Sequence, residues 1–148
     1  MNSINTITIT GSRKLSKKHI WKKFDEYLNL WTKCGRKWLV GGACGVDHWA
    51  IEWLLEKNED CTAVVPFTIL SQPKVVQPIL KEMKKNGKVI ELKLPNNKGA
   101  YLIRNKFMVD RSNVVIGFWN GRTGGSSKTL IYGIEKGREV HAYPIKLS

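Results

Sequence analysis

The sequence predicts an α/β domain built on a mostly parallel sheet. Short apolar runs alternate with amphipathic helical patterns along the whole chain, which is the order of βαβ units. Glycine-rich turns stand at several points where a strand pattern gives way to a helical one. The 148 residues suffice for one domain with its own core, and the contents of 42% hydrophobic and 25% charged residues are typical of globular proteins. We therefore expect residues 1–148 to form a single domain.

The first strand and helix are marked by a change of period. Residues 4–10 alternate isoleucine with threonine or asparagine, which predicts a half-buried strand. The helix that follows is expected to begin after Ser16, because serine is a favoured N-cap residue. Apolar side chains then recur at helical spacing, and these core candidates are Ile20, Phe24, Leu28 and Trp31.

The middle of the chain continues the alternation of strands and helices. Its patterns predict strands at 37–41, 61–66 and 88–93, and helices at 45–58 and from about Pro78 to residue 86. Proline is favoured in the first turn of a helix, which places the second of these helix starts near Pro78. The core candidates of the first helix are Val46, Ala50, Trp53, Leu54 and Leu55.

The C-terminal third adds two helices and two strands. Its patterns predict helices at 100–111 and 126–136 and strands at 113–118 and 138–144. Gly137 is expected to close the last helix, since glycine is enriched just past helix C-termini. The core candidates of the helix at 100–111 are Leu102, Ile103, Phe107 and Met108.

The positive charge of the chain is large and segmental. The formal net charge is +13, and residues 1–40 carry nine Lys or Arg against Asp25 and Glu26. Residues 74–106 carry nine against Glu82 and Glu91, whereas residues 41–73 carry only Lys57 against five acids. Such a field attracts nucleic acid or a small polyanion. The alternative is a protein whose lysine-rich helix faces are simply solvated.

Cysteine usage and hydropathy exclude several protein classes. Cys34, Cys44 and Cys61 fit neither a metal-ligand spacing nor a disulfide framework, and small-residue packing is their expected role. The apolar stretches fall far short of the roughly 20 residues that a membrane-spanning helix requires. The N-terminus lacks the pattern of a signal peptide. We therefore expect a cytoplasmic protein without a metal, a cofactor or a membrane partner.

Three glycine-rich turns follow predicted strands and precede predicted helices. Glycine lets backbone N–H groups approach a ligand, and the following helix presents the positive end of its dipole. Because the C-terminal ends of parallel strands share one edge of the sheet, the turns predict a phosphate- or nucleotide-binding site there. The turns are Gly11-Ser12-Arg13, Gly41-Gly42-Ala43-Cys44-Gly45-Val46-Asp47 and Gly124-Gly125-Ser126-Ser127.

Several side chains near these turns are candidates for ligand contacts. Arg13 can add a bidentate charged contact, or lie on the surface beside Lys14. Asp47 can accept hydrogen bonds from ribose hydroxyls, or only cap the helix that follows it. Gly41 and Gly42 are expected to let their loop pack close to the neighbouring turn. Trp119, which ends a predicted strand, can flank a base or a ribose.

Four motifs, in order and with matching spacing, resemble the SLOG superfamily. This group includes the Rossmann-like core of DNA-processing protein A and the cytokinin-activating phosphoribohydrolases called LOG. The resemblance spans nearly the whole chain, is closest to the DNA-processing pattern, and implies a Rossmann-like three-layer sandwich with a sheet of five or six strands. The motifs are Gly11-Ser12-Arg13, Gly41-Gly42-Ala43-x-Gly45-Val46-Asp47, Arg104-Asn105-x-x-Met108 and Thr123-Gly124-Gly125-Ser126.

The resemblance assigns further roles and limits the chemistry. It favours Arg104 as a phosphate contact, while Asn105 can instead tie loops together. LOG enzymes carry a glutamate in a Pro-Gly-Gly-x-Gly-Thr-x-x-Glu segment, and the matching run here, residues 123–131, has no acid. Cleavage of an N-glycosidic bond would need a positioned carboxylate. If the chain is an enzyme, the candidate catalytic residues are Asp47, His48 and Asp110.

Three functions follow from these patterns. The leading hypothesis is non-catalytic sensing or sequestration of a phosphate-bearing nucleotide, such as an ADP-ribose-type or cyclic nucleotide signal derived from NAD. The first alternative is DNA-processing-like binding of single-stranded DNA, which the charge and the motif match favour. The second is a nucleotide N-glycosidase of the phosphoribohydrolase type. The tryptophan-rich helices suggest a homo-oligomer.

Overall fold

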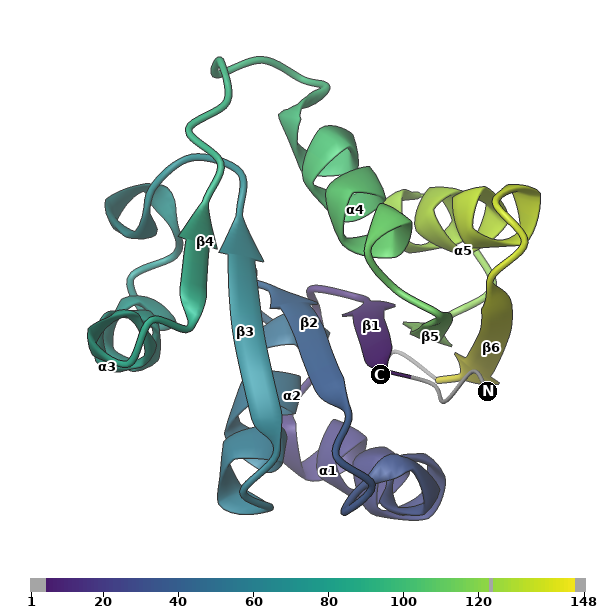
Figure 1. The fold of residues 1–148 in the computed structure, drawn as a ribbon. Helices are drawn as coiled ribbons and strands as arrows, with labels where there is room; N and C mark the ends of the chain where they lie inside the picture. The colour runs from purple at the N-terminus through teal and green to yellow at the C-terminus, as the bar shows by residue number, and fades with distance from the viewer. Residues whose placement is uncertain (1–4, 123, 146–148) are drawn as a thin grey trace.

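The computed structural model describes residues 5–122 and 124–145, and its centre is a six-stranded parallel sheet (Figure 1). The strand order is β4-β3-β2-β1-β5-β6, and every neighbouring pair is parallel. The strands are β1 (Thr6–Gly11), β2 (Lys37–Gly41), β3 (Asp60–Val65), β4 (Val89–Glu91), β5 (Val114–Trp119) and β6 (Glu139–Pro144). The predicted fold class is confirmed. The predicted start of the first strand at residue 4 and the motif residue Thr123 lie outside the described residues.

Helices cover both faces of this sheet and complete three layers. They are α1 (Lys17–Tyr27), α2 (Val46–Glu56), α3 (Gln77–Lys85), α4 (Ala100–Asp110) and α5 (Gly125–Glu135). Helices α1, α2 and α3 bury their apolar side chains in one core with Ile7 and Ile9 of β1. Helices α4 and α5 cover the opposite face, where Met108 and Leu130 belong to separate buried clusters (Figure 1).

The local signals for helix ends act as the sequence predicts. The hydroxyl of Ser16 accepts a hydrogen bond from the N–H of His19 at 3.3 Å, which caps α1. Pro78 lies in the first turn of α3, and Gly137 follows the end of α5. Two short 3₁₀ turns, Asn29–Trp31 and Ile69–Ser71, have no counterpart in the predicted elements.

Helix α4 buries only part of the face that was expected. Ile103 is 48% exposed, and Leu102 and Phe107 are only half-buried. The helix instead packs through Ala100, Arg104 and Met108, which lie four residues apart. Met108 is thus confirmed as a core residue and Phe107 packs against its cluster, whereas the prediction for Ile103 was wrong, because Arg104 faces the sheet in its place. Leu55 of α2 is exposed as well, and Trp31 is half-buried.

The remaining class predictions concern cysteines and membranes. Cys61 is buried in β3, Cys44 is half-buried and Cys34 is exposed. Burial raises the pKa of the Cys61 thiol far above its usual range, so this thiol stays protonated. In the part of the chain that the structure describes, no helix has the length and apolar character needed to span a membrane.

Candidate functional site

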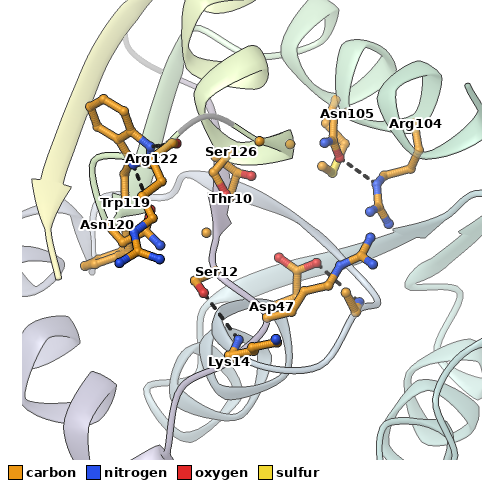
Figure 2. A pocket seen from close by; sticks show the side chains of 17 residues that line it. Thr10, Ser12, Lys14, Asp47, Arg104, Asn105, Trp119, Asn120, Arg122 and Ser126 are labelled. Carbon is orange, nitrogen blue, oxygen red and sulfur yellow. Dashed lines mark hydrogen bonds between the residues drawn. The ribbon is translucent and has the colours of Figure 1, made fainter. Parts of the chain in front are cut away.

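A pocket of about 590 Å³ opens at the C-terminal ends of β1 and β5. Figure 2 shows that Trp119, Asn120 and Arg122 form one side of it, that Arg104 and Asn105 of α4 lie on another, and that Ser12, Lys14 and Asp47 close a third. The pocket is lined by Thr10, Gly11, Ser12, Arg13, Lys14, Ala43, Asp47, Arg104, Asn105, Met108, Phe118, Trp119, Asn120, Arg122, Gly124, Gly125 and Ser126. Its volume is in the range of small-molecule sites.

The structure brings the first and third glycine-rich turns together at this pocket. Gly11, Ser12 and Arg13 lie on its wall, and so do Gly124, Gly125 and Ser126. Ser127 lies outside the lining, since its hydroxyl donates to the carbonyl oxygen of Gly124 at 2.9 Å and accepts from the Gly124 N–H at 3.0 Å. Its side chain therefore caps α5 rather than facing a ligand.

The second turn contributes mainly by packing against the first. The N–H of Val46 donates to the carbonyl oxygen of Ser12 at 2.9 Å. Gly45 has a φ of +76°, and a Cβ there would collide with the carbonyl oxygen of Ser12. The glycines that let the two turns approach are thus Gly45 and Gly11, whose Cβ would lie 2.6 Å from Val46, and not Gly41 or Gly42 as expected. Neither Gly41 nor Gly42 lines the pocket.

Asp47 is the carboxylate in the pocket wall, and it is only 8% exposed. Its Oδ2 accepts a hydrogen bond from the N–H of Ala43 at 3.2 Å, which holds the second turn in shape. Burial raises the pKa of Asp47, while the positive charges of Arg104 and Arg13 and the Ala43 N–H oppose that rise. Within the structure, the Asp47 side chain thus stabilises the conformation of the second turn.

Arg104 lies inside the pocket wall and is only 3% exposed. Its Nη1 donates to the carbonyl oxygen of Val64 at 3.1 Å, and its Nε donates to Oδ1 of Asn105 at 2.7 Å. Burial lowers the pKa of this guanidinium, and the charge of Asp47 opposes the shift. Two of its nitrogens are therefore already committed to protein acceptors. A Cβ on Gly41 would lie 2.7 Å from Nη1, so the arginine rests directly on that glycine.

Asn105 extends this hydrogen-bond chain to α5. Its Nδ2 donates to the hydroxyl of Thr129 at 2.9 Å, and that hydroxyl donates to the carbonyl oxygen of Gly125 at 2.8 Å. Thr129 is 1% exposed. The chain from Val64 through Arg104, Asn105 and Thr129 thus links β3 to the first residue of α5. Buried networks of this kind fix the relative positions of the elements they join.

The exposed charges of the pocket come from three other residues. Arg13, Lys14 and Arg122 are exposed and line the pocket, and within residues 5–122 and 124–145 none of them forms an ion pair. The guanidinium carbon of Arg13 lies 4.8 Å from the ring centroid of Tyr101, a side chain that is 37% exposed. The sequence prediction missed Arg122 and Tyr101. The position of Arg122 between Gly121 and the third turn was the available signal.

Trp119 and the candidate catalytic residues are placed differently. Trp119 is half-buried at the pocket, and its indole N–H donates to the carbonyl oxygen of Arg122 at 2.7 Å. His48 lies outside the pocket lining, where its Nε2 is 2.9 Å from Glu52 and its ring stacks on Trp49. Asp110 accepts a hydrogen bond from the hydroxyl of Tyr132 at 2.7 Å, at the opposite edge of the sheet. The three candidates Asp47, His48 and Asp110 therefore do not converge.

Comparisons with known proteins agree with this architecture. A family model for DNA recombination-mediator protein A matches residues 1–148. The structure of DNA processing protein A from Streptococcus pneumoniae is similar, with a TM-score of 0.74 and 20% identity over 97% of this chain and 52% of that chain. The protein from Helicobacter pylori, described with a single-stranded DNA binding mode, gives a TM-score of 0.75 and 23% identity over 97% and 67%. No curated protein sequence matches the chain.

These alignments have two consequences. The chain spans about half the length of the pneumococcal protein and about two thirds of the Helicobacter protein. At such identities the structural similarity supports the fold alone. The predicted resemblance to DNA-processing protein A is confirmed, while the resemblance to the LOG enzymes stays a prediction.

Proposed function

This chain belongs to the DNA recombination-mediator protein A family, and from that premise we propose that its pocket binds the backbone of single-stranded DNA. The observation that carries the proposal is the set of three exposed cations around one pocket, Arg13, Lys14 and Arg122, which form no ion pair within the described residues. Phosphates supply most of the affinity in nucleic-acid binding. The comparisons favour this function over the sequestration of an ADP-ribose-type or cyclic nucleotide.

The N-terminus of α5 supplies the proposed phosphate contacts. A Cβ on Gly125 would meet no described atom within 4 Å, and its φ is not in the positive region. Neither packing nor backbone conformation therefore explains a glycine at this position. An approaching phosphate does explain it, since the absence of a side chain leaves the backbone N–H groups accessible. Arg13 lines the same pocket and can hold the phosphate by its charge.

Aromatic side chains at the pocket are suited to hold a base. The ring of Tyr101 is 37% exposed and lies 4.8 Å from the guanidinium of the lining residue Arg13, and Trp119 lines the pocket itself. Bases stack on such rings with little dependence on sequence, at about 1–3 kcal/mol per base. We therefore propose that the chain binds single-stranded DNA with little preference for base sequence.

The same pocket offers little for hydrolysis of an N-glycosidic bond. Asp47 is the sole carboxylate among the described lining residues, and its Oδ2 is bonded to the Ala43 N–H. General acid or base chemistry would require a carboxylate that reaches the reacting atoms. We propose a binding function, carried by residues 1–148 acting as a single domain.

Fluorescence anisotropy with a labelled oligothymidylate tests the proposal. The wild-type protein is expected to bind it, with log K falling linearly against log salt concentration. Arg122→Gln is expected to reduce the slope by about 0.7, the value for one phosphate contact on a single strand. Lys88→Gln is the control. The Nζ of Lys88 is 2.8 Å from Oδ1 of Asp60, and Lys88 is not among the residues that line the pocket.

Competition decides between the hypotheses. Unlabelled single strands should displace the probe, whereas ADP-ribose and cyclic nucleotides should not. Absence of oligonucleotide binding at low salt would refute the proposal, and displacement by micromolar ADP-ribose would restore the nucleotide hypothesis.

A further inference from the structure

Basic residues continue from the pocket onto the start of α1. Lys14 lines the pocket, and Figure 2 shows it close to Ser12 on the segment that leaves β1. Helix α1 begins at Lys17, three residues later. The N-terminal half of α1 is therefore within reach of a polyanion that leaves the pocket on the side of Lys14.

The first turn of α1 has an unfavourable charge for its own stability. It carries Lys17 and Lys18 and no acidic residue. The N-terminus of a helix has a partial positive charge, so acids stabilise this turn and lysines destabilise it. Sequences break such local rules mainly at functional sites. An anion bound along this turn would remove the repulsion.

The lysines of α1 fall into two groups. Lys17 is 3.3 Å from Glu52 and lies over the ring of Trp21 at 4.8 Å, and Lys23 is 3.8 Å from Glu26. In contrast, Lys18 and Lys22 are exposed and form no ion pair within the described residues. Four residues apart, they share one helix face and are separated by about 6 Å along the axis.

Resting on the function proposed above, we infer that the DNA strand leaving the pocket past Lys14 runs along α1, where Lys18 and Lys22 hold successive phosphates. Because Lys17 already covers the ring of Trp21, the contacts on this face are charged rather than stacking. The strand is therefore held by its backbone there, without base preference.

Helix α3 provides a matched control for this inference. Lys81 and Lys85 are also exposed and four residues apart, although Lys85 lies 3.5 Å from Glu82. No residue of α3 is among the described residues that line the pocket, and α3 contacts the β4 edge of the sheet (Figure 1). The double variants K18Q/K22Q and K81Q/K85Q thus change the net charge equally, at two different places.

The experiment measures the salt dependence of binding for a short and a long oligothymidylate, of about 4 and about 16 nucleotides. With the long strand, K18Q/K22Q is expected to reduce the slope of log K against log salt by about 1.4, the value for two phosphates. With the short strand, which fills only the pocket, its slope should equal that of the wild type. K81Q/K85Q should leave both slopes unchanged.

Three results would overturn the α1 path. The first is an equal loss in both double variants, which would reflect net charge alone. The second is a long-strand slope unchanged in K18Q/K22Q, and the third is a short-strand slope that this variant reduces as much as the long-strand slope. In each case binding of the short strand by the wild type would leave the proposed pocket function intact, whereas failure of the wild type to bind either strand would refute that function too.

Discussion

Gly125→Ala is expected to increase stability and weaken DNA binding at the same time. The added methyl group would meet no described atom within 4 Å, and the φ of Gly125 already suits an L-residue. Replacing glycine by alanine at such a position stabilises a protein by about 0.4–1 kcal/mol, since it restricts the unfolded chain. For a domain of this size, that change raises the Tm by about 1–4 °C.

The same methyl group is expected to keep a phosphate away from the N-terminus of α5. Loss of one hydrogen bond to a charged group costs about 1.5–3 kcal/mol, which is about a ten- to hundredfold increase in Kd. Thermal unfolding without DNA and anisotropy with oligothymidylate measure the two effects separately. A higher Tm with unchanged Kd would refute the argument, because the glycine would then serve neither packing nor binding.

Three further predictions follow from buried and charged groups. Gly41→Ala is expected to lower the free energy of unfolding by about 1–3 kcal/mol, because its Cβ would lie 2.7 Å from the buried guanidinium of Arg104. Urea denaturation measures this, and an unchanged midpoint would contradict the packing described. Lys18→Glu is expected to stabilise the DNA-free protein by about 0.3–1 kcal/mol through the α1 dipole, and a lower Tm would argue against that electrostatic account. Burial lowers the pKa of His48 from its ordinary value of 6.5, against the opposing effect of Glu52, so the unfolded state takes up this proton first as the pH falls. The free energy of unfolding should therefore decrease below about pH 6.5, and His48→Gln should flatten that decrease in denaturation curves recorded across this range.

The buried polar side chains of the pocket wall support the structure, whereas the exposed cations are the ones available to a ligand. Arg104 donates to Val64 and Asn105, and Asn105 reaches Gly125 through Thr129. These hydrogen bonds fix the position of the third glycine-rich turn relative to α4 and β3. The exposed cations Arg13, Lys14 and Arg122, by contrast, lie on loops between strands and helices. Loops are where ligands are commonly bound.

Local patterns determined most of the fold. The alternation in β1, the Ser16 cap of α1 and the proline in the first turn of α3 each depend on neighbours a few residues away, so the sequence alone predicts them. The convergence of the first and third turns also follows, because all parallel strands end at the same edge of the sheet.

Tertiary packing decided which side chains face the pocket and which support it. The helical periodicity predicts that Ile103 lies in the core, but α4 turns Arg104 toward the sheet instead. Val64 and Asn105 accept hydrogen bonds from the Arg104 guanidinium, and Asp47 offsets its charge. Val64 and Asp47 are distant from Arg104 along the chain, and no local pattern encodes their meeting with it. Likewise Arg122 joins Arg13 only because β1 and β5 are neighbours in the sheet. Side-chain direction depends on long-range contacts, and these exist only once the chain is folded.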